Sequence, residues 1–219
     1  MPVVARSFRQ RGAVVALVAC CAAVIVQPAT TLGGARQTPL NANLVRNAGA
    51  EMGPHSYPEV AVKIPRWAEG KRFSVQPYGY PGQLPISESR RINGQRQFFA
   101  CGWGTTDTKL SQEIALVGRR RLTDRGGLRV EFKVMIAAYG RDGDRGRGIV
   151  RYLDAQRETI AARSTRWVST QSVRYTRRGF TMPLPRGTRY IRVQLHGVRQ
   201  AGLYCNAYFD NVRLKLSRR

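Results

Sequence analysis

Apolar and polar residues alternate most clearly in the segment 128–136. Its sequence, LRVEFKVMI, has an apolar side chain at every second position from Leu128 to Ile136 and charged side chains at three of the positions between them. A period of two is the pattern of a β-strand with one buried and one exposed face. Residues 191–195 and 212–216 carry the same alternation, so we predict strands at all three places.

Further strands are expected where the alternation is less regular. These weaker candidates are residues 72–76, 96–101, 110–117, 149–154 and 166–175. Segments that contain Gly or Pro, such as YGYPG at 78–82 and PLPRG at 183–187, separate them. Many short strands with such turns, and no long segment of helical periodicity, predict an all-β antiparallel sandwich, with a closed barrel as the alternative.

The N-terminus has the pattern of a targeting segment. Three arginines precede an apolar run at residues 13–26, which Gln27 and Pro28 interrupt. This run is shorter than the roughly 20 residues that a membrane span needs. We predict a signal peptide at residues 1–31, a linker at 32–42 and one domain at 43–219, and thus a secreted protein. A retained membrane anchor is one alternative, and lipidation of Cys20 in the lipobox-like sequence LVAC is another.

Removal of the signal peptide leaves two cysteines, Cys101 and Cys205. Two cysteines in an oxidising compartment most often form one disulfide, so we predict that they are bonded. A zinc site is excluded because the chain has no C-x-x-C pair and only two histidines.

The sequence is strongly basic. It has 37 Lys and Arg residues against 13 Asp and Glu residues, for a formal net charge of +24. Arginine binds carboxylate, phosphate and sulfate groups through two parallel hydrogen bonds. The cluster Arg119, Arg120 and Arg121 is therefore a candidate site for an acidic polymer or an anionic wall or membrane surface. The alternative is a solvated surface without a partner. Without a nucleic-acid-binding motif, sequence-specific DNA binding is not expected.

Motifs of the common enzyme classes do not occur. There is no G-x-S-x-G, G-x-x-x-x-G-K-[ST], G-x-G-x-x-G or H-E-x-x-H sequence. We therefore expect a protein that is not an enzyme. Glycoside hydrolysis needs only two carboxylates, so a glycan hydrolase is kept as an alternative.

Several short motifs resemble one family, in that family's order. The sequence NLVRNAGAE at residues 43–51 resembles the opening N-L-[IV]-x-N-P-G-[FA]-E of galactose-binding-like jelly-roll domains, which include the CenC-like carbohydrate-binding modules. Similar matches follow at residues 64–67, 98–102, 153–155, 184–195 and 206–216. The chain departs from the pattern at Ala48, where the family has Pro, and at Cys101, where it has Gly. The resemblance implies jelly-roll topology for the sandwich.

The resemblance also implies a structural calcium ion that joins the opening motif to the last strand. By position, Glu51 and Asp210 would supply carboxylate oxygens and Asn211 would assist. Such oxygen ligands suit calcium. The alternative is that both carboxylates pair with arginines.

Aromatic rings in turns are candidate platforms for a sugar, because a flat ring stacks on the apolar face of a pyranose. Trp103, Tyr80 and Tyr139 are the candidates chosen here, whereas Trp67 and Tyr208 are expected to fill the sandwich. We therefore predict a secreted, non-catalytic module that binds cell-surface glycans or acidic polymers. The alternative is a structural or adhesive envelope protein that is held by its basic surface and has no sugar site.

Overall fold

The computed structural model describes residues 36–57, 60–68, 72–138, 142–169 and 173–219. The chain divides between Gly34 and Ala35, and all the described residues belong to the second unit. The expected signal peptide, its alternatives at Cys20 and the apolar run, and Tyr139 therefore lie outside the described residues.

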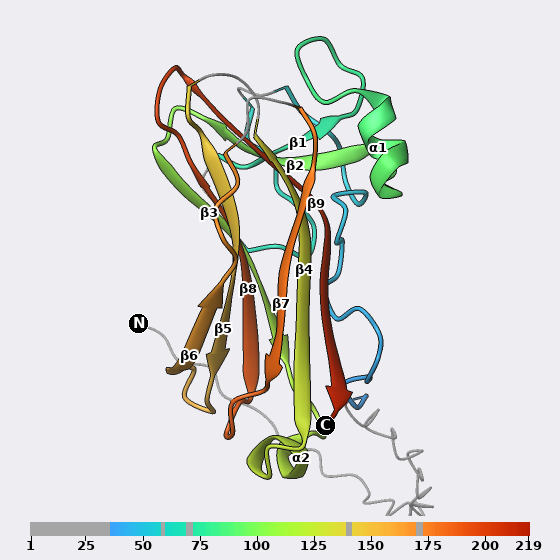
Figure 1. The fold of residues 1–219 in the computed structure, drawn as a ribbon, viewed down its shortest axis with the longest axis vertical. Helices are drawn as coiled ribbons and strands as arrows, with labels where there is room; N and C mark the ends of the chain where they lie inside the picture. Colours follow the sequence, from blue (N-terminus) through green and yellow to red (C-terminus); the bar gives the residue numbers. More distant parts are fainter. Residues whose placement is uncertain (1–35, 58–59, 69–71, 139–141, 170–172) are drawn as a thin grey trace, which may run out of the picture. The chain divides into compact units, whose positions relative to one another are not determined.

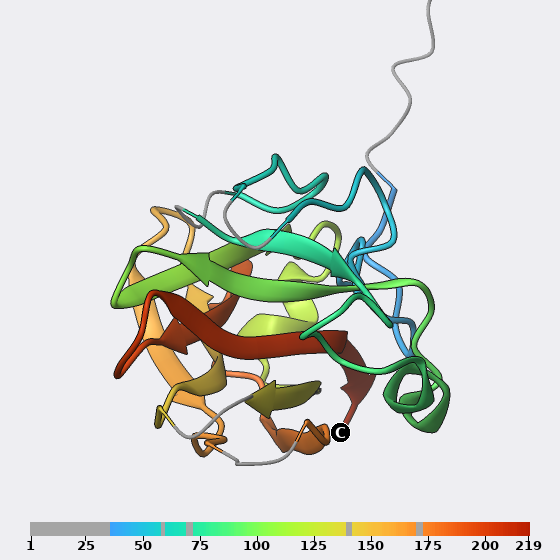
Figure 2. The same cartoon turned by 90° about the horizontal axis from the view of Figure 1, so that it is seen from above.

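The described residues form nine strands and two short helices. In chain order these are β1 (Ser74–Pro77), α1 (Ile86–Ile92), β2 (Gln97–Trp103), β3 (Asp107–Ala115), α2 (Arg120–Asp124), β4 (Leu128–Ala138), β5 (Arg145–Leu153), β6 (Thr159–Ser164), β7 (Thr176–Pro183), β8 (Tyr190–Val198) and β9 (Tyr204–Arg218). They form two antiparallel sheets, of order β1-β2-β9-β4-β7 and β3-β8-β5-β6. Figures 1 and 2 show the sheets packed face to face, which confirms the predicted all-β sandwich.

The main core lies between the two sheets. The alternating side chains of β4, from Leu128 to Ile136, are buried there together with those of β8 and of β9 from Cys205 to Leu216. The register is continuous along β3, β8 and β5, where Leu110, Leu195 and Gly148 occupy one row. The three strong strand predictions are thus confirmed, because each strand packs one full apolar face into this core.

The opening motif runs beside β9, as the family resemblance implies. The side-chain oxygen of Asn43 accepts a hydrogen bond from the backbone N–H of Leu214 at 3.0 Å, and its amide donates to the carbonyl of Val212 at 3.0 Å. Trp67 donates from Nε1 to the carbonyl of Asn47 and packs in the main core, as expected. Residues 37–41, in the expected linker, also hydrogen-bond to the domain, since the backbone N–H of Asn41 donates to the carbonyl of Leu216.

A disulfide joins Cys101 of β2 to Cys205 of β9, which confirms the predicted pair. The two α-carbons are 5.4 Å apart, and both side chains lie in the main core. The bond packs against Gly197 of β8 in the opposite sheet. A Cβ at position 197 would lie 2.4 Å from the Cβ of Cys101, so only glycine fits there.

A second apolar cluster covers the outer face of the five-stranded sheet at its β1 end. Outward-facing residues of β2, β4 and β9, among them Phe98, Ala137 and Tyr208, pack against two residues at α1. These are Leu84, just before the helix, and Ile92, its last residue. Figure 1 shows α1 against this end of the sheet. Tyr208 is buried as expected, but in this outer cluster and not between the sheets.

Two edge strands were not predicted from the sequence. Residues 166–169 and 173–175 of the expected strand 166–175 contain only an isolated bridge at Val168, and β7 begins at Thr176 instead. β6 was missed altogether. Both are edge strands, β6 is almost wholly exposed, and β7 alternates without a run of apolar residues. The apolar alternation that reveals a central strand is therefore weak in them.

Candidate functional site

A cleft of about 380 Å³ opens at the β1 end of the five-stranded sheet. Its walls come from the segment before β1, the turn after β1, the end of β2 and the start of β9. A second hollow of about 420 Å³ lies beside it and shares Tyr57, Gln76 and Tyr80 with the first. We call the two together the tyrosine cleft.

Three tyrosines with exposed rings line this cleft. Tyr57 is 61% exposed, Tyr80 is 40% exposed and Tyr204 is 36% exposed. The rings of Tyr57 and Tyr80 meet edge to face, with their centroids 5.7 Å apart. Such a contact holds the rings in a fixed relation while leaving surface for a ligand. Of the expected sugar platforms, Tyr80 is therefore part of the cleft.

Amide side chains supply the polar groups of the cleft. Gln76 is 3% exposed, and its Nε2 donates to Ser74 Oγ at 3.2 Å. Its Oε1 and the Oε1 of Gln83 are buried and accept no hydrogen bond from any described residue. A buried acceptor without a partner is costly unless something else satisfies it. Both glutamines line the cleft, so either oxygen could accept a hydrogen bond from a ligand once its amide turns toward it.

Two aspartates hold the β9 side of the cleft in place. Asp144 accepts hydrogen bonds from the backbone N–H groups of Gln200 and Asn206, each at 2.7 Å. The amide of Asn206, which lines the cleft, donates to Asp142 Oδ2 at 3.2 Å. Burial raises the pKa of the Asp144 carboxyl despite these hydrogen bonds. The loop between β8 and β9 is thereby fixed against β5.

Trp103 does not line the tyrosine cleft. It ends β2 opposite Tyr204, and the guanidinium of Arg72 lies 5.1 Å from the centre of its ring. The residues lining the cleft come instead from Tyr57, the turn at 80–83 and the start of β9. Of these, Tyr57, Gln76, Gln83, Tyr204 and Asn206 were not predicted, because they come from distant segments that only sheet pairing brings together.

The arginine cluster lies at the other end of the sandwich from the tyrosine cleft. Figure 1 shows α2, which carries Arg120 and Arg121, opposite the β1 end. Arg119 donates from Nε to the carbonyl of Thr38 at 2.8 Å, so it ties down the chain that precedes the opening motif. Arg120 lies 3.8 Å from Asp124, with its side chain 82% exposed. The structure therefore does not bring these arginines together with Tyr80 or Trp103, the predicted sugar platforms among the described residues.

The two predicted calcium ligands, Glu51 and Asp210, lie close together. A Cβ at Gly49 would be 3.0 Å from Asp210 Oδ1 and 3.9 Å from the Cγ of Glu51. Glu51 Oε1 accepts hydrogen bonds from the backbone N–H groups of Arg96 and Gln97 at 2.9 Å. Its Oε2 is buried without a hydrogen bond from the described residues, although the exposed Arg96 guanidinium approaches to 3.6 Å.

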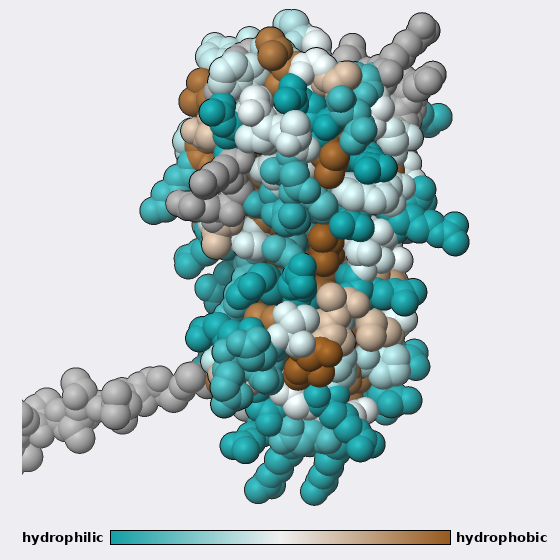
Figure 3. All heavy atoms as spheres, turned by 90° about the vertical axis from the view of Figure 1, so that its left-hand side faces the viewer, coloured by the Kyte–Doolittle hydropathy of each residue, from teal (hydrophilic) through white to brown (hydrophobic). Residues whose placement is uncertain are grey.

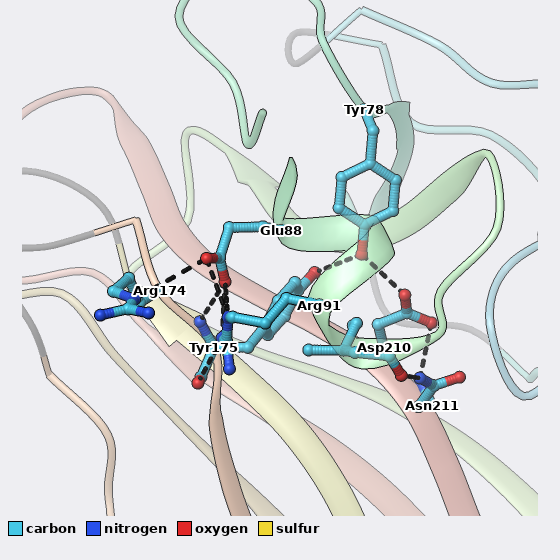
Figure 4. A network of polar contacts seen from close by, with 8 residues as sticks. Tyr78, Glu88, Arg91, Arg174, Tyr175, Asp210 and Asn211 are labelled. Carbon is cyan, nitrogen blue, oxygen red and sulfur yellow. Dashed lines mark hydrogen bonds and ion pairs between the residues drawn. The ribbon is translucent and has the colours of Figure 1, made fainter. Parts of the chain in front are cut away.

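Asp210 is 1% exposed, and its hydrogen bonds are made to tyrosine and backbone groups. Its Oδ2 accepts from the Tyr78 hydroxyl at 2.7 Å, and its Oδ1 accepts from the backbone N–H of Asn211 at 2.6 Å (Figure 4). Burial raises the pKa of Asp210 to about 7, and the charge of Glu51 adds to this effect. The Asn211 amide donates to the carbonyl of Ile92 at 2.7 Å and so is engaged elsewhere.

The same network continues to Glu88 on α1 (Figure 4). The Tyr78 hydroxyl, whose proton goes to Asp210, accepts a hydrogen bond from the hydroxyl of Tyr175 at 3.1 Å, and the backbone N–H of Tyr175 donates to Glu88 Oε2 at 3.0 Å. Arg91 pairs with Glu88 at 2.6 Å, and its hydrogen bonds hold the pKa of that carboxyl below its usual range. This chain of contacts fastens α1 and the segment before β7 to the sheet.

The Glu51 and Asp210 oxygens fit a hard cation in part. A nearby cation would give the unpartnered Oε2 of Glu51 a partner, and it would lower the raised pKa of Asp210. Gly49 and Gly94 lie so close to Asp210 that a side chain at either would crowd its oxygens. The described residues hold no cluster of three or more acidic, histidine or cysteine ligands. Backbone carbonyls and water would have to complete the coordination.

Comparison with known proteins finds likeness in structure only. No family model matches the sequence, and neither does any curated protein. The enzymatically active domain of tailspike protein 4 from bacteriophage CBA120 matches with a TM-score of 0.53 and 11% identity, over 80% of this chain and 21% of that one. A Stig cyclase from Fischerella sp. TAU matches with a TM-score of 0.53 and 14% identity, over 80% of this chain and 97% of that one.

These two matches show the fold. The chain spans about a fifth of the tailspike domain but nearly all of the cyclase. A family 16 carbohydrate-binding module also matches, with a TM-score of 0.46 and 17% identity, over 78% of this chain and 99% of that module. The tailspike and the cyclase, with TM-scores of 0.53, show this fold as part of a larger chain and as nearly a whole chain.

Proposed function

We propose that this protein is a secreted, non-catalytic module that binds a glycan in the tyrosine cleft. The observation that carries the proposal is the pair of exposed rings, Tyr57 and Tyr80, beside the buried and unpartnered amide oxygen of Gln76. Aromatic walls with a few fixed polar groups are the usual composition of a small-ligand site. A pyranose presents apolar faces for such rings and hydroxyls for such oxygens.

The composition of the cleft supports binding and not hydrolysis. Its described lining consists of aromatic rings, amides, glycines and prolines together with His55, Ser56, Cys205 and two valines, and it includes no carboxylate. Retaining and inverting glycosidases use a pair of carboxylates across the scissile bond. The buried carboxyl of Asp210, whose pKa is raised, is bonded to Tyr78 outside this lining.

Two further proposals concern family and location. Membership of the CenC-like group is supported by the opening motif, which pairs with β9 through Asn43. Secretion is supported by the disulfide, since such bonds persist in oxidising compartments. Within the part of the chain that the structure describes, neither helix has the length and apolarity to cross a membrane.

We also propose a structural calcium ion between Glu51 and Asp210. The proposal is supported by the proximity of the two carboxylates and by the unpartnered oxygen of Glu51. A divalent cation there would neutralise the buried Asp210 and the partly buried Glu51, and would join the opening motif to β9. Asn211 is left out of the ligand set, because its amide already donates to Ile92.

Affinity electrophoresis through gels that contain xylan, mannan or β-glucan tests the glycan proposal. We expect the full-length chain to be retarded by at least one neutral polysaccharide. Tyr80→Ala should lower that affinity at least 10-fold, about 1.4 kcal/mol, because it removes half of the ring pair. Gln76→Leu should lower it as well, since it removes an acceptor without opening the core.

Trp103→Ala is the matched control, since Trp103 is a nearby aromatic residue that does not line the cleft. It should leave the affinity within about twofold of the wild type. Loss of binding in Trp103→Ala with retention in Tyr80→Ala would place the sugar elsewhere and refute the cleft. Absence of retardation in all the neutral gels would refute the proposal for these glycans.

A further inference from the structure

The outer face of the four-stranded sheet carries a concentration of positive charge. The pairing of β3, β8 and β5 places Lys109, His196 and Arg147 in one row and Glu113, Arg192 and Arg151 in another. We call this surface the basic face, and it comprises Asp107, Lys109, Glu113, Arg145, Arg147, Arg151, Arg157 and Arg192. Figure 3, which views the molecule from the side of this sheet, shows a mainly hydrophilic surface.

The two carboxylates of the basic face are already engaged. Asp107 Oδ1 pairs with Lys109 at 2.8 Å, and Glu113 pairs with both Arg157 and Arg192, at 2.9 and 2.8 Å. Three cations remain, namely Arg145, Arg147 and Arg151. None of them has a carboxylate partner among the described residues.

These three guanidinium groups are held in position by neutral groups. Arg147 and Arg145 lie over the ring of Trp167, at 4.2 and 4.8 Å from its centre. Arg147 also donates from Nε to His196 Nδ1 at 3.2 Å, and Arg151 donates from Nε to Gln194 at 3.0 Å. Each of these hydrogen bonds uses only Nε, so the terminal nitrogens stay available for an anion.

The surroundings of Arg147 favour the arrival of an anion. Partial burial lowers the pKa of Arg147, the charge of Asp107 raises it, and the neighbouring charge of Arg145 lowers it. Asp107 is itself paired with Lys109 and His196, so its charge is shared among several partners. Two like charges stacked on one ring repel each other, and an oxyanion that bridges them would remove that repulsion. The positive charge of this pair is therefore incompletely compensated within the described residues.

We propose that the basic face binds an acidic polysaccharide, whose carboxylate or sulfate groups are held by Arg145, Arg147 and Arg151. All three project from β5 on the same side of the sheet. The rise of a strand places Arg145 and Arg147 about 7 Å apart along β5, and Arg147 and Arg151 about 13 Å apart. An extended chain that lies along β5 can thus meet all three with successive acidic groups.

The same face is poorly suited to nucleic acid. Single-stranded nucleic acids gain much of their affinity by stacking bases on open aromatic rings. Here Trp167 lies beneath two guanidinium groups, and Tyr190 lies beneath Arg157 at 4.5 Å. The arginines therefore occupy the ring faces that bases would need, whereas an acidic sugar chain requires only the guanidinium forks.

The proposal is tested by measuring how the full-length chain binds polygalacturonate. Fully methyl-esterified polygalacturonate is the uncharged control. We expect binding to the acid form at about 50 mM salt, a steep loss by about 200 mM, and no binding to the ester. Arg145→Gln with Arg147→Gln should weaken binding at least 10-fold. Arg120→Gln with Arg121→Gln, which removes the same charge at α2, should weaken it less than twofold.

Further variants distinguish the basic face from the tyrosine cleft and from the arginines of α2. Arg151→Gln removes a side chain that hydrogen-bonds to Gln194, and it provides a second variant if the Arg145 and Arg147 double variant fails to fold. Tyr80→Ala should retain polygalacturonate binding, so a failure of the glycan cleft leaves this result unchanged. Equal losses in the Arg145/Arg147 and Arg120/Arg121 variants would overturn the site, as would equal binding to the ester. Tighter, Arg147-dependent binding to single-stranded DNA would identify a nucleic-acid surface instead.

Discussion

The disulfide should supply a large part of the stability of this domain. Cys101 and Cys205 are 104 residues apart, so the bond closes a very long loop in the unfolded chain. Loop-closure entropy for about 100 residues corresponds to about 4.7 kcal/mol at 25 °C. A domain of this kind is stable by only about 5–15 kcal/mol. Cys101→Ala with Cys205→Ala should therefore lower the free energy of unfolding by about 4–5 kcal/mol, as measured by equilibrium denaturation in urea.

The single variants make this test specific to the bond. Either Cys101→Ala or Cys205→Ala alone breaks the disulfide, so each should cost nearly as much as the double variant, and the two losses should not add. Reduction of the wild type should reproduce the same loss. Single-variant losses that sum to the double-variant loss, or a total below about 1 kcal/mol, would show that the loop-closure reasoning is wrong.

Two smaller predictions concern the buried carboxylates. Calcium at about 100 times its dissociation constant should stabilise the wild type by about 2.7 kcal/mol, and the Tm should therefore be higher in calcium than in EDTA. Asp210→Asn should abolish this difference in Tm, whereas the exposed control Asp124→Asn should keep it. Glu88→Gln should cost about 1–3 kcal/mol above pH 4.5. Because Arg91 lowers the pKa of Glu88, the wild-type advantage should shrink as the pH falls below 4.5, and equal losses at pH 3 and pH 7 in denaturation curves would contradict this.

The sequence predicts those parts of the fold that the main core determines. β4 and β8 alternate because one face of each packs between the sheets, and a period of two is visible without any structure. The edge strands β6 and β7 bury few side chains, so their sequences carry little of that signal. The disulfide was predicted because only two cysteines follow the expected signal peptide.

The candidate site was less accessible to sequence reasoning. Tyr57, Gln76 and Tyr204 come from segments far apart in the chain and meet only through the pairing of β1, β2 and β9. Trp103 was chosen for its glycine-flanked turn, but a local motif does not reveal that Arg72 lies over the ring. Similarly, Arg119 stands in an arginine run, but its hydrogen bond to Thr38 depends on a contact 81 residues away.

The two outer faces of the sandwich differ for a physical reason that separates the ligands we propose for them. At the β1 end, the five-stranded sheet has apolar residues on both faces, so the α1 segment must cover the outer one. The tyrosine cleft lies at the margin of this cover, where rings and amides are partly shielded from water. Most apolar residues of the four-stranded sheet point inward, although Ile149 and Leu153 lie on the outer side of β5, and the charged rows of that outer face remain in contact with solvent. A neutral sugar gains most binding affinity where water is already displaced from the protein surface. A polyanion gains affinity where its binding releases counterions. The two sites should therefore respond independently to substitution, and only binding at the basic face should depend steeply on salt.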